Sequence, residues 1–133
     1  MRYNLDAFAC PHCHRNEINP LFVRWFNREI VDPIESAADI QACGPIKVVL
    51  TSGWRCHHHD SAVGGKGVHT KGIAADWVIR PWLSEAIPTV VEIILASSAG
   101  GIGMRIHGEY GKRFFHTDLR DGERYIWTYN ARG

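Results

Sequence analysis

Residues 69–79 have the sequence His69-Thr-Lys-Gly-Ile-Ala-Ala-Asp-Trp-Val-Ile79, in which a glycine-containing loop leads into an apolar run. The run from Ile73 to Ile79 is typical of a buried strand, and Pro81 marks its end. His69 and Asp76 are seven residues apart, with Gly72 between them. Neighbours on one helix face are three or four residues apart, so this spacing predicts a loop that crosses over and enters a strand.

Further segments along the chain have the composition of short strands. They are rich in β-branched or aromatic residues, and turn-forming residues separate them. Together with the segment above, the predicted strands cover residues 46–52, 73–79, 100–104, 114–119 and 125–129.

Helical signals come before the strands and once between them. Asn19-Pro20 is an N-cap followed by proline at the first helical position, and an apolar face follows at helical spacing. Pro33 should kink or end this helix. Further helical pieces are expected over residues 36–42 and 84–98. Helices first, then a sheet with one helix inserted, predict an α+β fold: a small central antiparallel sheet packed against helices.

Length and composition predict one domain over residues 1–133, with 45% hydrophobic and 22% charged residues. The net charge of +1 gives no reason to expect a nucleic acid or a membrane as partner, and we expect a monomer. No apolar run approaches the roughly 20 residues of a membrane-spanning helix. The first residues lack the apolar core of a secretory signal, so we expect synthesis in the cytoplasm without a signal peptide.

Residues 53–72 are rich in Gly and His without apolar periodicity, which predicts a loop. This loop contains the run His57-His-His-Asp60. Adjacent histidines point in different directions, so an exposed, partly ordered loop is favoured here over a second transition-metal site.

The four cysteines are Cys10, Cys13, Cys43 and Cys56. Cys10-Pro-His-Cys13 has the C-x-x-C spacing of half a structural zinc knuckle or of a redox pair. A knuckle would need a second pair, and Cys43 and Cys56 are too far apart to form one cleanly. A structural role, as a disulfide or a buried cluster, is favoured, and the redox state stays open.

Three side chains form a candidate metal group. Strand alternation places His116 and Asp118 on the same face, and Ala74 and Ala75 leave room beside Asp76. Catalytic zinc is typically held by three nitrogen or oxygen ligands and keeps a fourth position for water. Each side chain alone is more often a satisfied polar group, but the set of His69, Asp76 and His116 favours zinc.

Several short motifs occur in a fixed order around this group. The chain resembles the family of zinc D-Ala-D-Ala carboxypeptidases and L-alanyl-D-glutamate endopeptidases, above all its small phage endolysins, over residues 8–127. The motifs are Ser52-Gly-Trp-Arg55, Val63-Gly-Gly65, His69-x-x-Gly72-x-Ala-Ala-Asp76, Gly101-Ile-Gly103, Phe115-His116-x-Asp118 and Trp127.

The resemblance implies one catalytic zinc ion held by His69, Asp76 and His116. The implied activity is a metallopeptidase that hydrolyses peptidoglycan stem peptides, with a metal-activated water as nucleophile. Such a protein, without a separate wall-binding domain, would reach the cell wall after holin-type release. Arg55 would hold a substrate carboxylate or the oxyanion, with Ser52 and Asp118 also at the substrate. Alternatively, Arg55 forms a surface salt bridge, and Asp118 orients His116 or caps a turn.

The general base is less well defined. Many relatives place a carboxylate three residues before the last zinc histidine, where this chain has Arg113. His107 is the first candidate base, because histidine as a residue type ordinarily exchanges its proton near neutral pH, and Glu109 is the second. Either residue could instead be a solvated loop residue. The alternative function is therefore a catalytically silent, zinc-containing module that binds cell wall or protein.

Overall fold

The computed structural model describes residues 2–129, which form a five-stranded sheet with helices against it. The strand order is β1-β2-β4-β3-β5. The strands are β1 (Lys47–Ser52), β2 (Ala74–Arg80), β3 (Gly101–Arg105), β4 (Phe114–Asp118) and β5 (Tyr125–Thr128). The predicted α+β class is confirmed.

The sheet is mixed rather than wholly antiparallel. β1, β2, β4 and β3 pair antiparallel, whereas β5 runs parallel to β3. After β4 the chain crosses β3 and forms β5 at the free edge of the sheet. β5 therefore pairs with β3 and not with β4, the strand before it in the sequence. A sequence pattern of short strands does not specify this crossing.

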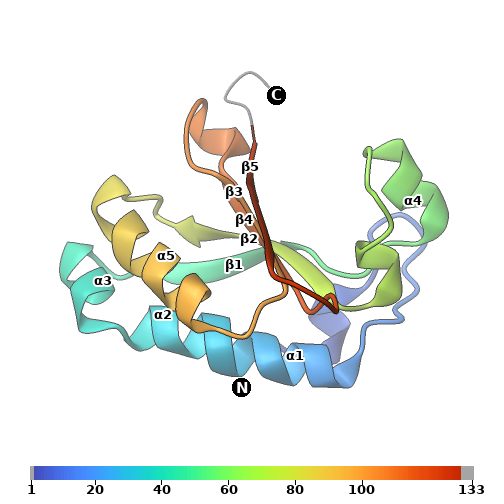
Figure 1. The fold of residues 1–133 in the computed structure, drawn as a ribbon, viewed down its shortest axis with the longest axis horizontal. Coiled ribbons are helices and arrows are strands. Elements are labelled where there is room, and N and C mark those ends of the chain that lie inside the picture. The colour runs from blue at the N-terminus through green and yellow to red at the C-terminus, as the bar shows by residue number, and fades with distance from the viewer. Residues whose placement is uncertain (1, 130–133) are drawn as a thin grey trace.

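The helices lie mainly on one side of the sheet. Figure 1 shows α1, α2, α3 and α5 grouped together, whereas α4 lies apart from them at the other end of the molecule. The helices are α1 (Pro20–Phe26), α2 (Asp32–Ser36), α3 (Ala38–Cys43), α4 (His57–Ala62) and α5 (Ile87–Ala96). A π-helical segment, Asn27–Val31, joins α1 to α2. In the described chain no helix is long and apolar enough to cross a membrane.

The helix signals were largely correct. The Asn19 side chain accepts a hydrogen bond from the N–H of Leu21, and Pro20 begins α1. The helix does not end at Pro33, however: helical backbone runs without a break from Pro20 to Ser36, and Pro33 directly follows the π-helical segment. The predicted helix over residues 84–98 consists of a 3-10 turn, Ser84–Ala86, followed by α5.

The prediction of a loop over residues 53–72 was wrong in part. α4 forms there, and its first turn is capped by the Cys56 sulfur, which accepts a hydrogen bond from the N–H of His59. A 3-10 turn, His69–Lys71, follows. Cysteine is not among the usual N-cap residues, so the start of α4 gave no recognisable signal.

The two faces of the sheet have different roles. Trp77 of β2 stacks on Phe115 of β4 with ring centroids 4.7 Å apart, and Trp77 meets Phe26 of α1. These side chains are fully buried on the helix-covered face. Burying a large apolar side chain contributes roughly 1.5–3 kcal/mol. Because side chains alternate along a strand, Asp76 and His116 emerge on the opposite face, away from the helices.

Candidate metal centre

The register of β2 and β4 brings two of the three predicted ligands side by side. Asp76 pairs directly with His116, and Gly103 of β3 pairs with His116 on its other side. Directly opposed residues on antiparallel strands have Cβ atoms about 4.5–5.5 Å apart, close enough to share one ion. Asp76 and His116 thus lie next to each other on the open face.

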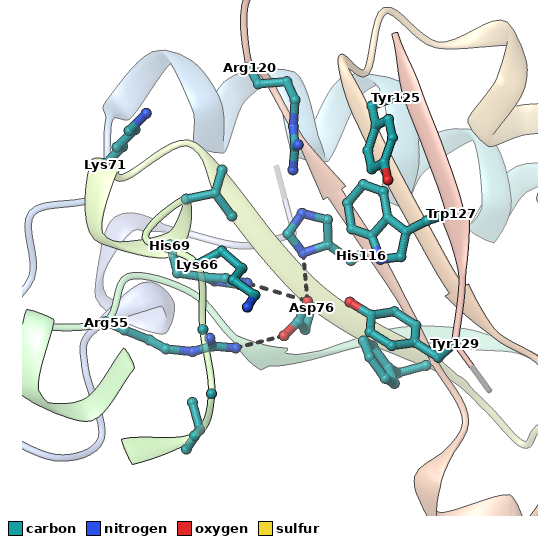
Figure 2. A pocket seen from close by; sticks show the side chains of 15 residues that line it. Arg55, Lys66, His69, Lys71, Asp76, His116, Arg120, Tyr125, Trp127 and Tyr129 are labelled. Atoms are coloured by element: carbon teal, nitrogen blue, oxygen red, sulfur yellow. Dashed lines mark hydrogen bonds and ion pairs between the residues drawn. The ribbon is translucent and has the colours of Figure 1, made fainter. Parts of the chain in front are cut away.

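His69 completes the group from outside the sheet. Its Nε2 lies 3.4 Å from Asp76 Oδ1, and His116 Nδ1 lies 2.9 Å from the same oxygen. The three side chains offer ligand atoms that all lie within 4.8 Å of one another. Figure 2 shows them converging from the 3-10 turn and the two strands. Tetrahedral zinc with bonds of 2.0–2.1 Å would separate such atoms by about 3.3 Å, so the spacing suits a small metal ion.

The His69 ring is oriented by the backbone. Its Nδ1 lies 2.8 Å from the carbonyl oxygen of Gly53, which can only accept, so Nδ1–H donates and Nε2 is left free for a metal. The turn that bears His69 ends at Gly72, whose φ of +73° is left-handed. A Cβ at Gly72 would lie 2.4 Å from the carbonyl oxygen of Glu17, so this position also has no space for a side chain.

Asp118 orients the second imidazole from behind. Its Oδ2 lies 2.7 Å from His116 Nε2, which leaves Nδ1 facing Asp76. Asp118 is fully buried and also accepts hydrogen bonds from the backbone N–H and the guanidinium of Arg120. A carboxylate that binds the outer nitrogen of a metal-ligating histidine fixes its tautomer and raises its basicity. Asp118 does not line the cavity, and its predicted contact with substrate stays a prediction.

Charge is tightly balanced within the group. Burial favours the neutral acid, but hydrogen bonds with His116 and His69 hold the pKa of Asp76 well below its ordinary value. Burial favours neutral His116, yet its hydrogen bonds to Asp118 and Asp76 raise the pKa of this imidazole above its ordinary value. A protonated His116 donates one hydrogen bond to each of the two carboxylates, Asp76 and Asp118.

We expect the apparent affinity for zinc to fall as the pH falls. Because the pKa of His116 is raised, a metal ion has to displace a proton at any pH below that pKa. One displaced proton changes the affinity about tenfold per pH unit, and the dependence flattens above the raised pKa. Zinc titrations over about pH 5–9, with the His69→Ala variant as blank, measure this dependence. An affinity that is constant over that range would contradict it.

Replacing Asp118 by asparagine is expected to weaken zinc binding about 10–100-fold. The neutral amide supports His116 less strongly, and Arg120 loses its charged partner. Competition with a chromophoric chelator measures the affinity, and Asp121→Asn, an exposed carboxylate on the next turn, is the matched control. Equal affinities of the Asp118 and Asp121 variants would show that Asp118 does not support the ligand.

Arg55 spans the group on its other side. Its guanidinium donates to Asp76 Oδ2 at 2.8 Å and to Asp60 Oδ1 at 3.0 Å, and its Nε donates to Ser52 Oγ at 3.0 Å. The Arg55 side chain is 11% exposed, and its partners Asp60 and Asp76 are 5% and 16% exposed, so this is not a surface salt bridge. Ser52 holds Arg55 and does not line the cavity.

Asp60 is a buried residue of the site that the sequence interpretation missed. Its carboxylate binds Arg55 and also accepts a hydrogen bond from the N–H of Gly67 at 2.9 Å. A Cβ at Gly65 would lie 2.1 Å from Asp60 Oδ1, so the glycine lets the loop close over this carboxylate. The glycines that precede His69 were the available signal for a tightly packed loop.

The metal group lies in a cavity of about 680 Å³ with cationic and aromatic walls (Figure 2). Tyr125, Trp127 and Tyr129 come from alternate positions of the last strand and its extension, and Trp127 lies 5.2 Å from the ring of His116. A Cβ at Gly103 would lie 2.6 Å from the Trp127 ring, so only glycine lets the indole reach this position. The cationic side chains in the lining are Arg55, Lys66, Lys71 and Arg120.

Most of this wall was not predicted. Trp127 was part of the sequence motif, but Tyr125, Tyr129, Lys66 and Arg120 were not proposed as site residues. The alternation of aromatic residues in the predicted strand 125–129 was the signal that could have found the two tyrosines.

The structure does not bring His107 and Glu109 to the metal group. Both are exposed in the loop between β3 and β4, and neither lines the cavity. Arg113, in the same loop, lies over the ring of Tyr110 at 4.1 Å and donates to the carbonyl oxygen of Gly108.

No protein-family model matches this chain, and no curated protein sequence matches it.

Proposed function

We propose that this protein is a zinc-dependent peptidase that hydrolyses peptide bonds in peptidoglycan stem peptides. The main support is the convergence of His69, Asp76 and His116 at the wall of an open cavity. In each histidine, the ring nitrogen that faces away from the metal group is hydrogen-bonded to the protein. Two imidazoles and one carboxylate are a typical ligand set for hydrolytic zinc. The substrate class follows from the family resemblance of the motifs around these residues.

Zinc, when bound, would supply Lewis acidity that polarises a carbonyl and activates a water. The protein's own side chains would supply the stabilisation of charge on the substrate. Ser52 and Asp60 hold Arg55 in one position before substrate arrives, so that its guanidinium is preorganised next to the reacting group. A planar guanidinium suits either a substrate carboxylate or an oxyanion.

The walls of the cavity suit an acidic peptide. Lys66 and Lys71 line the cavity and have no carboxylate partner within residues 2–129, whereas Arg120 is paired with Asp118, and the whole chain has a net charge of only +1. Stem peptides contain free carboxylates, which such a wall would attract. Figure 2 shows the Tyr129 hydroxyl pointing toward Asp76, where it can donate a hydrogen bond to a bound peptide.

A second candidate function is a zinc-containing module that binds the cell wall without hydrolysing it. One specific observation favours it: in residues 2–129 the cavity lining contains no carboxylate other than Asp76. The usual position of the base is occupied by Arg113, which cannot accept a proton.

Digestion of purified peptidoglycan with the full chain separates the two functions. A peptidase releases new amino groups in proportion to time and enzyme, loses this activity with a chelator and regains it with zinc. Mass analysis of the released muropeptides identifies the bond that is cut. If the zinc-loaded protein sediments with the walls but releases no amino groups, it is a binding module and the peptidase proposal fails.

His107→Ala and Glu109→Gln test whether either residue is the base. A general base contributes about 10²–10⁴-fold to the rate. Because both side chains are exposed and lie outside the cavity, we expect both variants to keep most of the wild-type activity. A loss of about 100-fold or more in one variant, with its zinc content unchanged, would identify that residue as the base.

A further inference from the structure

Three of the four cysteines form a second cluster, away from the cavity. Cys10, Cys13 and Cys56 have sulfur atoms within 4.8 Å of one another, and none of them is in a disulfide. Cys10 is fully buried. Cys43 is not part of this cluster: its thiol donates to the carbonyl oxygen of Asp39 in α3.

The first two sulfur atoms come from a tight turn near the N-terminus. The N–H of Cys10 donates to the carbonyl oxygen of Arg15, and the N–H of His14 donates to that of Cys10, both at 2.8 Å. His14, directly after the second cysteine, has a φ of +64°. A residue other than glycine is uncommon in this left-handed region, and its backbone is strained there. The two backbone hydrogen bonds stabilise this turn, which brings the sulfur atoms of Cys10 and Cys13 close to each other.

His12, between the two cysteines, brings an imidazole next to Cys56. Its Nδ1 lies 3.6 Å from Cys56 Sγ, and its ring stacks on the rings of His58 and His59 at 5.0 and 5.9 Å. Zinc bonds of about 2.3 Å to sulfur and 2.0–2.1 Å to nitrogen, at a tetrahedral angle, separate the two ligand atoms by about 3.6 Å. The observed distance agrees with this geometry.

Backbone N–H groups point at the sulfur atoms. Cys56 N–H donates to Cys10 Sγ at 3.5 Å, and His59 N–H donates to Cys56 Sγ at 3.4 Å. Such donors favour the thiolate, which is the form that binds a metal.

We propose that Cys10, Cys13, Cys56 and His12 bind a second zinc ion in a closed, structural site. Three thiolates and one imidazole are a common set for structural zinc, and four protein ligands leave no position for water. A dithiol redox pair is disfavoured, because a redox pair does not need the third thiol and the imidazole that are present here. The proposal is independent of peptidase activity.

The position of Cys56 indicates what this zinc site stabilises. Cys56 directly follows Arg55, and the neighbouring Trp54 N–H donates to the carbonyl oxygen of Phe8 at 2.9 Å. The same loop contains the Gly53 carbonyl that orients His69. A metal joining residues 10–13 to Cys56 therefore fixes the loop that supplies both groups to the first metal site.

Zinc analysis of the purified full chain, prepared under reducing conditions, tests the proposal. We expect about two zinc ions per wild-type chain and about one in each of the Cys56→Ser and His69→Ala variants. Cys43→Ser, a cysteine outside the cluster, is the matched control and should keep both. Cobalt in place of zinc should give a thiolate-to-metal charge-transfer band in His69→Ala that is lost in Cys56→Ser.

A chelator should lower the unfolding temperature of the His69→Ala variant, which retains the second site alone. If Cys10→Ser does not fold, the cobalt spectrum of the wild type and of His12→Ala still reports on the ligands. Two results would overturn the second site. One is a single zinc ion per wild-type chain that is lost in His69→Ala. The other is a Cys10–Cys13 disulfide detected by mass analysis of protein purified under reducing conditions. Either result would leave the peptidase proposal standing, because the peptidoglycan digestion tests that proposal separately.

Discussion

The His69→Ala variant is expected to lose peptidoglycan hydrolysis by at least about 10³-fold. His69 is one of three residues that can hold a metal ion at the cavity, and its ring is buried and fixed by the Gly53 carbonyl. Its removal leaves two ligands, which is fewer than hydrolytic zinc sites use. Initial rates of amino-group release from purified walls, measured at equal protein concentration with added zinc, give the magnitude.

The matched control is His57→Ala, which removes an exposed histidine of α4. This variant should hydrolyse walls at the wild-type rate. Thermal unfolding of both variants shows whether His69→Ala, which loses a buried side chain, is still folded at the assay temperature. Wild-type activity in a His69→Ala protein whose zinc content has fallen by one ion would show that the reaction does not need this metal group.

The Arg55→Ala variant is expected to show the second largest effect, a fall of about 10²–10³-fold in kcat. The guanidinium is next to Asp76 and is held by Ser52 and Asp60, so it is already in position when charge develops in the transition state. Its loss also leaves two carboxylates without their cation, and breaking a buried pair costs about 3–5 kcal/mol. Steady-state kinetics together with urea unfolding separate the two effects.

Two further variants show which role of Arg55 matters. Arg55→Lys keeps the charge but replaces the three separate nitrogens that bond Ser52, Asp60 and Asp76 by a single nitrogen, so its kcat should lie between those of Arg55→Ala and wild type. Asp60→Asn leaves the guanidinium in place and should mainly lower stability. If Arg55→Ala loses stability but keeps its kcat when assayed well below its unfolding midpoint, Arg55 is a structural residue only.

The strands and the metal group could be read from local patterns, because these depend on residue type and spacing. The alternation in Phe115-His116-Thr117-Asp118 places His116 and Asp118 on one face, as the structure has it. The direct pairing of Asp76 with His116 depends on strand register across 40 residues. Register of distant strands is set by the packed sheet and not by either strand alone.

The parts that escaped prediction depend on contacts between distant segments. Cys56 caps α4 and also meets Cys10, which lies 46 residues away, so neither role has a local signature. The general base stays a prediction for a related reason. His107 and Glu109 are candidates by residue type and by their proximity in sequence to His116, whereas both side chains are exposed in the loop between β3 and β4 and do not line the cavity. Residues chosen for their chemistry still need the fold to bring them to the site.

The parallel pairing of β5 with β3 separates the aromatic wall of the cavity from the metal group. Tyr125 and Trp127 belong to β5, an edge strand that pairs with β3, whereas Asp76 and His116 pair directly on β2 and β4. An edge strand can open locally while the rest of the sheet stays folded. Opening of β5 would therefore widen the cavity next to His116 and leave the metal ligands in their places.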